Sequence, residues 1–259
     1  MTRAHLAPRG AALTATAALV LAGCGGDDGD DGGGPKPRLV VSAAASMTEP
    51  LTACSRDYLG ATVRLSFAGS DELAAQIEQG VKPDVYAAAN TKLPDRLHEE
   101  GKLGRPVEFA TNTLVLAVPK DSPIASVDDL TKSGTKIAVG SESVPIGSYT
   151  RETLARLPPG EETAILANVR SNEPDVKGIV GKLTQGAADA GFVYVTDVNA
   201  TDGELKAIAL PSRLEPKVTY GAGVVSTSRH RDLAEKYVAG LTRGACADAL
   251  EEAGFGPAP

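Results

Sequence analysis

Short apolar runs alternate with amphipathic segments along most of this chain. The runs have the length of strands, and the segments between them carry apolar residues at helical spacing and end at glycine or proline. The expected strands are 39–43, 62–67, 83–89, 112–119, 136–140, 190–195, 206–210 and 218–225, with a strand or turn at 165–169. The expected helices are 71–79, 93–100, 127–130, 149–157, 176–185, 232–241 and 245–253. Strands that alternate with helices indicate an α/β fold with parallel sheets.

The alternation occurs in two sets. Extended apolar segments near residues 110–118 and 210–222 separate the sets, which predicts two lobes joined by two hinge crossings. Lobe I is expected to hold residues 38–112 and 219–259, and lobe II residues 113–218, each with a parallel-dominated sheet flanked by helices. Ligands of open α/β sheets bind beyond the carboxyl ends of the strands, so a site is expected in the cleft between the lobes.

A strand that runs into small residues and a serine, just where a helix should begin, occurs twice. Residues 43–45 are alanines before Ser46, and residues 68–69 are Ala-Gly before Ser70. A helix start presents backbone N–H groups without intrahelical partners and the positive end of the helix dipole, which together suit an anion. The alternative is that each serine only caps its helix, with Glu49 closing a capping box for Ser46.

Pro50 bears on the role of Ser46. Proline lacks an N–H and belongs in the first turn of a helix, which favours Thr48 as the N-cap residue. The Ser46 hydroxyl is then free to bind a ligand.

The N-terminus has the features of an export signal. Arg3 and Arg9 precede an apolar run at 11–21 that is too short to span a membrane, and the Leu-Ala-Gly before Cys24 resembles a bacterial lipobox. Residues 1–23 are therefore expected to be a lipoprotein signal peptide, and residues 24–37 a Gly/Asp-rich tether with a lipid on Cys24. The anchor would hold the protein on the extracytoplasmic face of the cell membrane.

Two cysteines remain after Cys24, at Cys54 and Cys246. In an exported protein an even number suggests a disulfide, here between the first and last helices if these are neighbours. The alternative is two buried free thiols.

Charge and composition exclude several functions. The 259 residues carry a formal net charge of −7, which argues against nucleic acid as a partner and means that any anion is captured by a local site. The three histidines, His5, His98 and His230, lack metal-ligand spacing, so no cation site is expected. An anchored hydrolase is a further alternative, but the chain has no Gly-x-Ser-x-Gly motif, and a scaffold or adhesion module would not need the repeated serine pattern.

Short motifs occur in order along the chain: AAAS at 43–46, SFAGS at 66–70, PDV at 83–85, VPIG at 144–147, DV at 175–176 and GFVY at 191–194. Together they resemble the periplasmic molybdate-binding protein of molybdate ABC transporters, over roughly residues 38–256. This resemblance implies a two-lobe, type II periplasmic-binding-protein fold. It also implies an oxyanion held by two serine hydroxyls, backbone N–H groups and a tyrosine hydroxyl, which fall on Ser46, Ser70, Ile146, Val176 and Tyr194.

The resemblance implies a transport protein rather than an enzyme. The expected ligand is molybdate, with tungstate or sulfate as alternatives; the partner is an ABC permease, no cofactor is needed, and the protein acts as a monomer. The chain departs from the family pattern at two positions: Gly69 stands where a serine is common, and Ile146 where alanine is usual. Because Ile146 is expected to contribute its backbone N–H, only the size of the pocket should change.

Overall fold

The apolar run that follows Arg38 forms β1 (Arg38–Ala44), which is buried from residue 41 onward. The computed structural model describes residues 36–56 and 58–259. β1 pairs in parallel with β2 (Thr62–Ala68) and β3 (Val85–Ala88), and three more strands pair in antiparallel orientation: β4 (Val107–Asn112), β10 (Val218–Val224) and β11 (Gly256–Pro257). The order across this first sheet is β11-β4-β10-β3-β1-β2.

A second sheet holds the middle of the chain, in the order β7-β6-β8-β5-β9. Its strands are β5 (Leu114–Pro119), β6 (Ile137–Gly140), β7 (Val169–Glu173), β8 (Ala190–Tyr194) and β9 (Leu205–Ala209). β6 pairs in parallel with β7 and β8, whereas β5 pairs in antiparallel orientation with β8 and β9. Every residue of β6 and β8 is buried, as expected for central strands covered on both faces.

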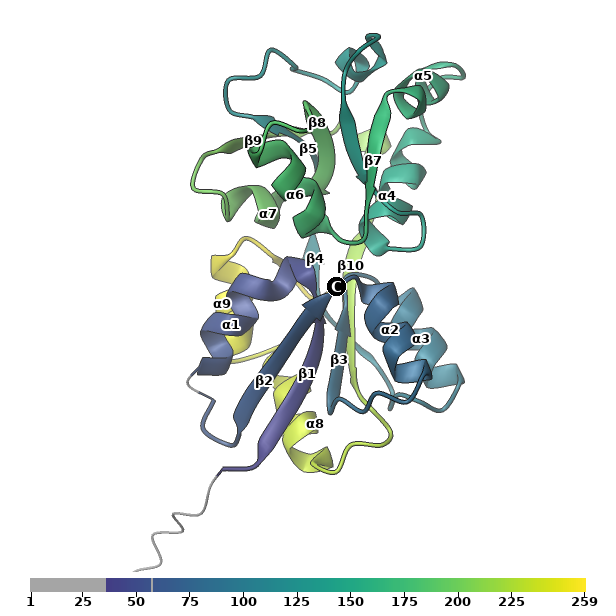
Figure 1. The fold of residues 1–259 in the computed structure, drawn as a ribbon. Coiled ribbons are helices and arrows are strands. Elements are labelled where there is room, and N and C mark those ends of the chain that lie inside the picture. The colour runs from purple at the N-terminus through teal and green to yellow at the C-terminus, as the bar shows by residue number, and fades with distance from the viewer. Residues whose placement is uncertain (1–35, 57) are drawn as a thin grey trace, which may run out of the picture. The chain divides into compact units, whose positions relative to one another are not determined.

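Helices cover both sheets (Figure 1). The longer helices bury several positions on one face; α6, for example, buries positions 176, 179 and 183. Beside the first sheet lie η1 (Ala45–Met47), α1 (Thr48–Arg56), α2 (Ser70–Glu78), α3 (Lys92–Glu99), α8 (Arg231–Gly240) and α9 (Ala245–Glu252). Beside the second lie η2 (Asp128–Thr131), α4 (Pro145–Leu154), α5 (Glu161–Ala167), α6 (Val176–Thr184), α7 (Val195–Asn199) and η3 (Ser212–Leu214).

The chain passes between the two sheets on paired strands. β4 and β10 lie side by side in the first sheet (Figure 1), and the run expected as one strand at 112–119 is divided at Thr113 into the end of β4 and β5. The strands that follow these connections, β5 and β10, pair in antiparallel orientation with their neighbours in each sheet. The α/β prediction is confirmed, but the pairing within each sheet is mixed rather than dominated by parallel pairs.

Two helices were not predicted. Residues 165–169, expected as a strand or turn, hold the end of α5 and the start of β7. Gly160 with φ +99° precedes α5, and two glutamates occupy its first turn, so local start signals were present. α7 was missed because it has only five residues and its first residue, Val195, continues the apolar run of β8.

A disulfide joins α1 to α9, between Cys54 and Cys246. Residues 36–259 form one compact unit. Within the described part of the chain, no helix has both the length and the apolar character needed to cross a membrane. The predicted signal segment, Cys24 and the tether up to residue 35 lie outside the described residues.

Candidate functional site

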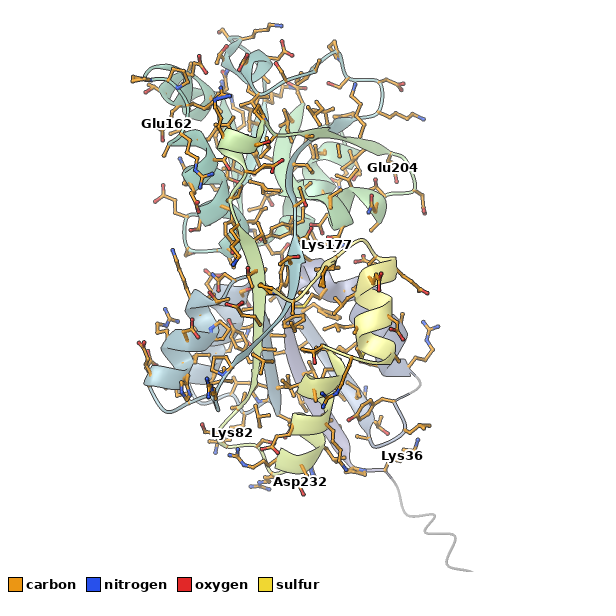
Figure 2. All side chains as sticks on the ribbon, turned by 180° about the vertical axis from the view of Figure 1, so that it is seen from behind. Lys36, Lys82, Glu162, Lys177, Glu204 and Asp232 are labelled. Carbon is orange, nitrogen blue, oxygen red and sulfur yellow. A yellow bond between two sulfur atoms is a disulfide. The ribbon has the colours of Figure 1, made fainter. Side chains whose placement is uncertain are left out.

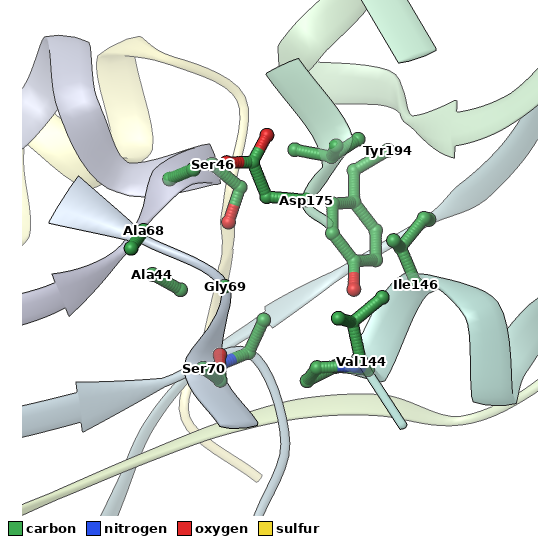
Figure 3. Close-up of a pocket in the computed structure, with 13 residues that line it drawn as sticks. Ala44, Ser46, Ala68, Gly69, Ser70, Val144, Ile146, Asp175 and Tyr194 are labelled. Atoms are coloured by element: carbon green, nitrogen blue, oxygen red, sulfur yellow. The ribbon is translucent and has the colours of Figure 1, made fainter. Parts of the chain in front are cut away.

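Four helix starts meet at one small cavity (Figure 3). They are those of η1, which continues into α1, and of α2 on the side of the first sheet, and those of α4 and α6 on the side of the second. The cavity volume is about 20 Å³, whereas one buried water needs about 10–15 Å³. The cavity therefore suits a single small solute rather than a sugar or a peptide.

The cavity lining contains all five residues expected to bind the ligand. It consists of Ala44, Ala45, Ser46, Ala68, Gly69, Ser70, Ala89, Val144, Pro145, Ile146, Asp175, Val176 and Tyr194. Ala44, Ala68 and Gly69 lie beside the two serines, as Figure 3 shows, and because they carry a methyl group or no side chain, a solute can approach the backbone at both helix starts.

Both serine hydroxyls accept or share a hydrogen bond from inside the protein. Ser70 is the first residue of α2 and is 1% exposed, and its Oγ accepts a hydrogen bond from the Ala89 backbone N–H at 3.1 Å. Ser46 lies in η1, is 3% exposed, and its Oγ is 2.9 Å from the hydroxyl oxygen of Tyr220. The Ser70 hydroxyl therefore keeps its own proton to donate. The described residues offer this proton no acceptor, so it is left to point into the cavity.

The capping alternative is wrong for both serines. Neither η1 nor α2 has a side-chain cap, and Glu49 pairs with Lys177 instead of closing a box with Ser46. Thr48 is not the N-cap residue either, since it follows η1 and donates its hydroxyl proton to the Ala45 carbonyl at 2.7 Å. The short 3-10 turn, with Ala44 as its N-cap residue, starts the helix four residues earlier than Pro50 suggested.

On the other side of the cavity, two backbone N–H groups lie at helix starts. Pro145 is the first residue of α4 and has no N–H, so Ile146 supplies the first backbone donor. Val176 is the first residue of α6, whose N-cap Asp175 accepts a hydrogen bond from the Gly178 N–H at 3.0 Å. These first-turn N–H groups have no intrahelical acceptor.

Tyr194 ends β8 and points its hydroxyl into the cavity (Figure 3). The side chain is 1% exposed, and the hydroxyl oxygen makes no hydrogen bond to any described residue. A buried hydroxyl without a partner costs free energy unless a ligand or water satisfies it. Burial, and secondarily the nearby Tyr220, raises the pKa of Tyr194 well above its usual value, so the group stays a neutral donor.

Among residues 36–56 and 58–259, no basic side chain lines this cavity, and Asp175 is its one charged lining residue. The described residues also contain no group of three His, Cys, Asp or Glu side chains that could hold a metal ion. The site is therefore a cluster of neutral donors at helix starts. That chemistry fits an anion whose oxygens all accept hydrogen bonds.

An ion-pair cluster borders the cavity next to Val176. Lys177 (Figure 2) places its Nζ 2.9 Å from Glu49 Oε2 in α1 and 3.5 Å from Asp197 Oδ1 in α7. Burial raises the pKa of the Asp197 carboxyl to about 7, although the Lys177 ammonium opposes this shift. The cluster joins helices that cover different sheets.

Comparison with known proteins identifies the family. The family model for bacterial extracellular solute-binding proteins matches residues 39–256. This chain belongs to that family. The expectation of a solute-binding protein rather than an enzyme is thereby confirmed, and the place of action is outside the cytoplasm.

Two curated relatives show how far the likeness extends. The molybdate-binding protein ModA of Mycobacterium tuberculosis H37Rv is 35% identical over 224 residues, which cover 84% of each chain. The putative ABC transporter substrate-binding lipoprotein YvgL of Bacillus subtilis is 31% identical over 258 residues, covering 93% of this chain and 94% of YvgL.

Solved structures of two binding proteins have the same fold. The substrate-binding domain of a putative molybdenum ABC transporter from Clostridium difficile is 29% identical, with a TM-score of 0.66, over 86% of this chain and all of that domain. The periplasmic molybdate-binding protein of Azotobacter vinelandii has a TM-score of 0.74 at 19% identity, over 84% of this chain and 98% of that protein. The predicted type II periplasmic-binding-protein fold is confirmed.

Some residues at the site were not found from the sequence. The Tyr220 hydroxyl contacts Ser46 and the Asn112 amide. Lys177, which follows Val176, pairs with Asp197 in α7, the helix that follows Tyr194. Their one local signal is a polar side chain inside or at the end of an apolar run, as for Tyr220 in β10. That signal does not say which distant side chain each would meet.

Proposed function

We propose that this protein captures molybdate in the cavity between its two sheets and delivers it to an ABC permease. The observation that carries the proposal is the set of four helix starts and three hydroxyls around one small cavity with no basic lining residue. The 35% identity to a protein named molybdate-binding ModA supports molybdate as the ligand. The ligand contacts proposed are the hydroxyls of Ser46, Ser70 and Tyr194 and the N–H groups of Ile146 and Val176.

Neutral donors can hold a dianion taken out of water. A hydrogen bond to a charged acceptor contributes roughly 1.5–3 kcal/mol, and helix starts add favourable dipoles. Several such bonds offset the desolvation of the dianion and leave a net binding free energy of about −8 kcal/mol, which is micromolar affinity. A protonated oxyanion binds less well, because its O–H group finds few acceptors in the cavity.

Binding is proposed to close the two lobes on the anion, with residues 38–112 and 219–259 moving against residues 113–218. The donors come from both sides of the cavity, so one anion can engage all of them only when the lobes are together. The pair between Glu49 and Lys177 would form in the same movement.

Titration calorimetry of the purified protein with molybdate, tungstate, sulfate and phosphate tests the function. Molybdate and tungstate are expected to bind at about micromolar Kd or tighter, and sulfate and phosphate at least tenfold more weakly. The reasons are the smaller size of sulfate and the proton that phosphate carries near pH 7. Sulfate affinity equal to that of molybdate would refute the ligand assignment, and no binding of any oxyanion would refute the site.

The protein is further proposed to be a monomer anchored by a lipid on Cys24. Support comes from the Leu-Ala-Gly-Cys sequence at residues 21–24 and from YvgL, a relative named as a lipoprotein. Mass spectrometry of protein extracted from membranes is expected to find a mature chain that begins at a diacylglycerol-modified Cys24. The Cys24→Ser variant should lose this modification and leave the membrane fraction, and a membrane-bound variant of unchanged mass would contradict the anchor.

A further inference from the structure

The side chain of Asn112 has a defined orientation. It ends β4, and its Oδ1 accepts a hydrogen bond from the Thr113 backbone N–H at 2.8 Å. A backbone N–H can only donate, so the oxygen of this amide must face it and the NH₂ group must face the other way. The donor end of Asn112 is therefore directed at its two remaining neighbours, Thr196 and Tyr220.

The amide orientation decides the direction of the next hydrogen bond. Asn112 Nδ2 donates to Thr196 Oγ1 at 3.0 Å and to the Tyr220 hydroxyl oxygen at 3.4 Å. Tyr220 is fully buried, and the one other hydrogen-bond partner the structure gives its hydroxyl is Ser46 Oγ, at 2.9 Å. Among the hydrogen bonds of the described residues, Ser46 Oγ is the one acceptor for the buried Tyr220 proton, so Tyr220 donates to Ser46 while it accepts from Asn112.

The same reasoning applies one step further. Ser46 Oγ accepts from Tyr220, and the structure gives the Ser46 hydroxyl no second partner among the described residues. Its proton is left to point into the cavity, where Figure 3 shows the Ser46 side chain directed. The donor direction thus runs from Asn112 through Tyr220 to Ser46.

We infer that Asn112 and Tyr220 are positioning residues that commit the Ser46 hydroxyl to donating toward the bound oxyanion. The inference rests on the proposed function, since it concerns the same cavity. A serine hydroxyl alone can donate or accept. With one lone pair occupied by Tyr220, Ser46 favours a fully deprotonated oxyanion over one that carries its own O–H.

The hydrogen bonds from Asn112 through Tyr220 to Ser46, called the relay below, lie on strands that connect the two sheets. Asn112 is the last residue of β4, Tyr220 belongs to β10, and Thr196 belongs to α7 beside the second sheet. The donor direction at Ser46 is therefore set by residues on the two strands that connect the sheets.

A double-mutant cycle with Ser46→Ala and Tyr220→Phe tests this, with molybdate affinity measured by calorimetry. Phenylalanine keeps the ring contacts of Tyr220 with Phe109, Tyr194 and Phe255 and removes only the hydroxyl. Ser46→Ala is expected to weaken binding by about 10- to 100-fold in the wild-type background, but by no more than about threefold in the Tyr220→Phe background. Equal losses in both backgrounds would overturn the relay.

The matched control is Tyr237→Phe. Tyr237 is also buried, and its hydroxyl oxygen lies 2.9 Å from Ser55 Oγ, so this variant removes the same kind of bond away from the cavity. Its molybdate affinity should equal that of the wild type. A loss equal to that of Tyr220→Phe would show a general stability effect and would also overturn the relay.

Asn112→Asp reverses the relay. A carboxylate at 112 accepts the Tyr220 proton, so Tyr220 then accepts from Ser46 and the Ser46 proton turns away from the anion. Binding should fall by about 100-fold, and adding Tyr220→Phe should restore part of it, because Ser46 is released. If the double variant binds molybdate no better than Asn112→Asp, the relay is wrong. If Asn112→Asp does not fold, the double-mutant cycle of Ser46→Ala and Tyr220→Phe tests the relay instead.

The failure of this inference is distinguishable from failure of the proposed function. Wild-type protein that binds no oxyanion refutes the function and with it the inference. Wild-type protein that binds molybdate but shows no coupling between positions 46 and 220 refutes the relay alone. The ratio of molybdate to phosphate affinity gives a second readout: it should fall in Tyr220→Phe and stay unchanged in Tyr237→Phe.

Discussion

Gly69→Val is expected to weaken molybdate binding by about 5- to 150-fold, because overpacking a tight contact costs roughly 1–3 kcal/mol. A Cβ atom at residue 69 would lie 2.5 Å from the carbonyl oxygen of Pro174, on the opposite side of the cavity, and 2.9 Å from Asp71 Oδ1. The backbone of Gly69 has φ −58° and ψ 137°, which any residue can adopt. Its lack of a side chain therefore serves the close approach of the two sides and not a strained backbone.

Titration calorimetry measures this effect, and thermal unfolding of the ligand-free protein separates it from misfolding. In the proposed open state the Pro174 contact is absent, so the melting temperature without ligand is expected to stay close to that of the wild type. The matched control is Gly240→Val, because a Cβ there meets nothing within 4 Å. Unchanged affinity in Gly69→Val would mean that the two sides of the cavity do not approach this closely around the ligand.

Removal of the disulfide has the largest expected effect on stability. The double variant Cys54→Ala/Cys246→Ala should lose about 2–5 kcal/mol of unfolding free energy, since the bond closes a long loop in the unfolded chain. The two cysteines are 192 residues apart in sequence. For a domain of this size the loss corresponds to a fall in melting temperature of about 4–20 °C.

Reductant distinguishes the cross-link from simple loss of buried side chains. Reduced wild-type protein should approach the melting temperature of the double variant, and the variant itself should not respond to reductant. Molybdate affinity should stay unchanged, because neither cysteine lines the cavity. A wild-type protein whose melting temperature ignores reductant would contradict the cross-link.

Much of the candidate site was predictable because its signals are local. A strand that ends in small residues before a helix start can be recognised within about ten residues, and Ser46 and Ser70 were found in this way. Ile146, Val176 and Tyr194 came from family resemblance, and the structure brings all five to one cavity. Their role as ligand contacts is a prediction for the titrations to test.

The remaining features depend on contacts between distant residues. Ser46 and Tyr220 are 174 positions apart, and nothing near either residue indicates that they share a hydrogen bond. The steric restriction on a side chain at residue 69 likewise comes from the distant Pro174. Local capping rules gave Ser46 a plausible partner in Glu49, which in the fold pairs with Lys177 instead.

The sequence by itself determined the α/β class, most strands and helices, and the two serine-bearing helix starts, because burial on one face leaves a periodic pattern within each element. Only the tertiary structure decided the antiparallel entry of β5 and β10, the division of the strand at Thr113 and the hydrogen-bond partners of Ser46 and Tyr220. The physical reason is that strand pairing and buried polar contacts are formed by partners far apart in the chain. A periodic pattern records that a residue is buried, but it does not record which residue it is buried against.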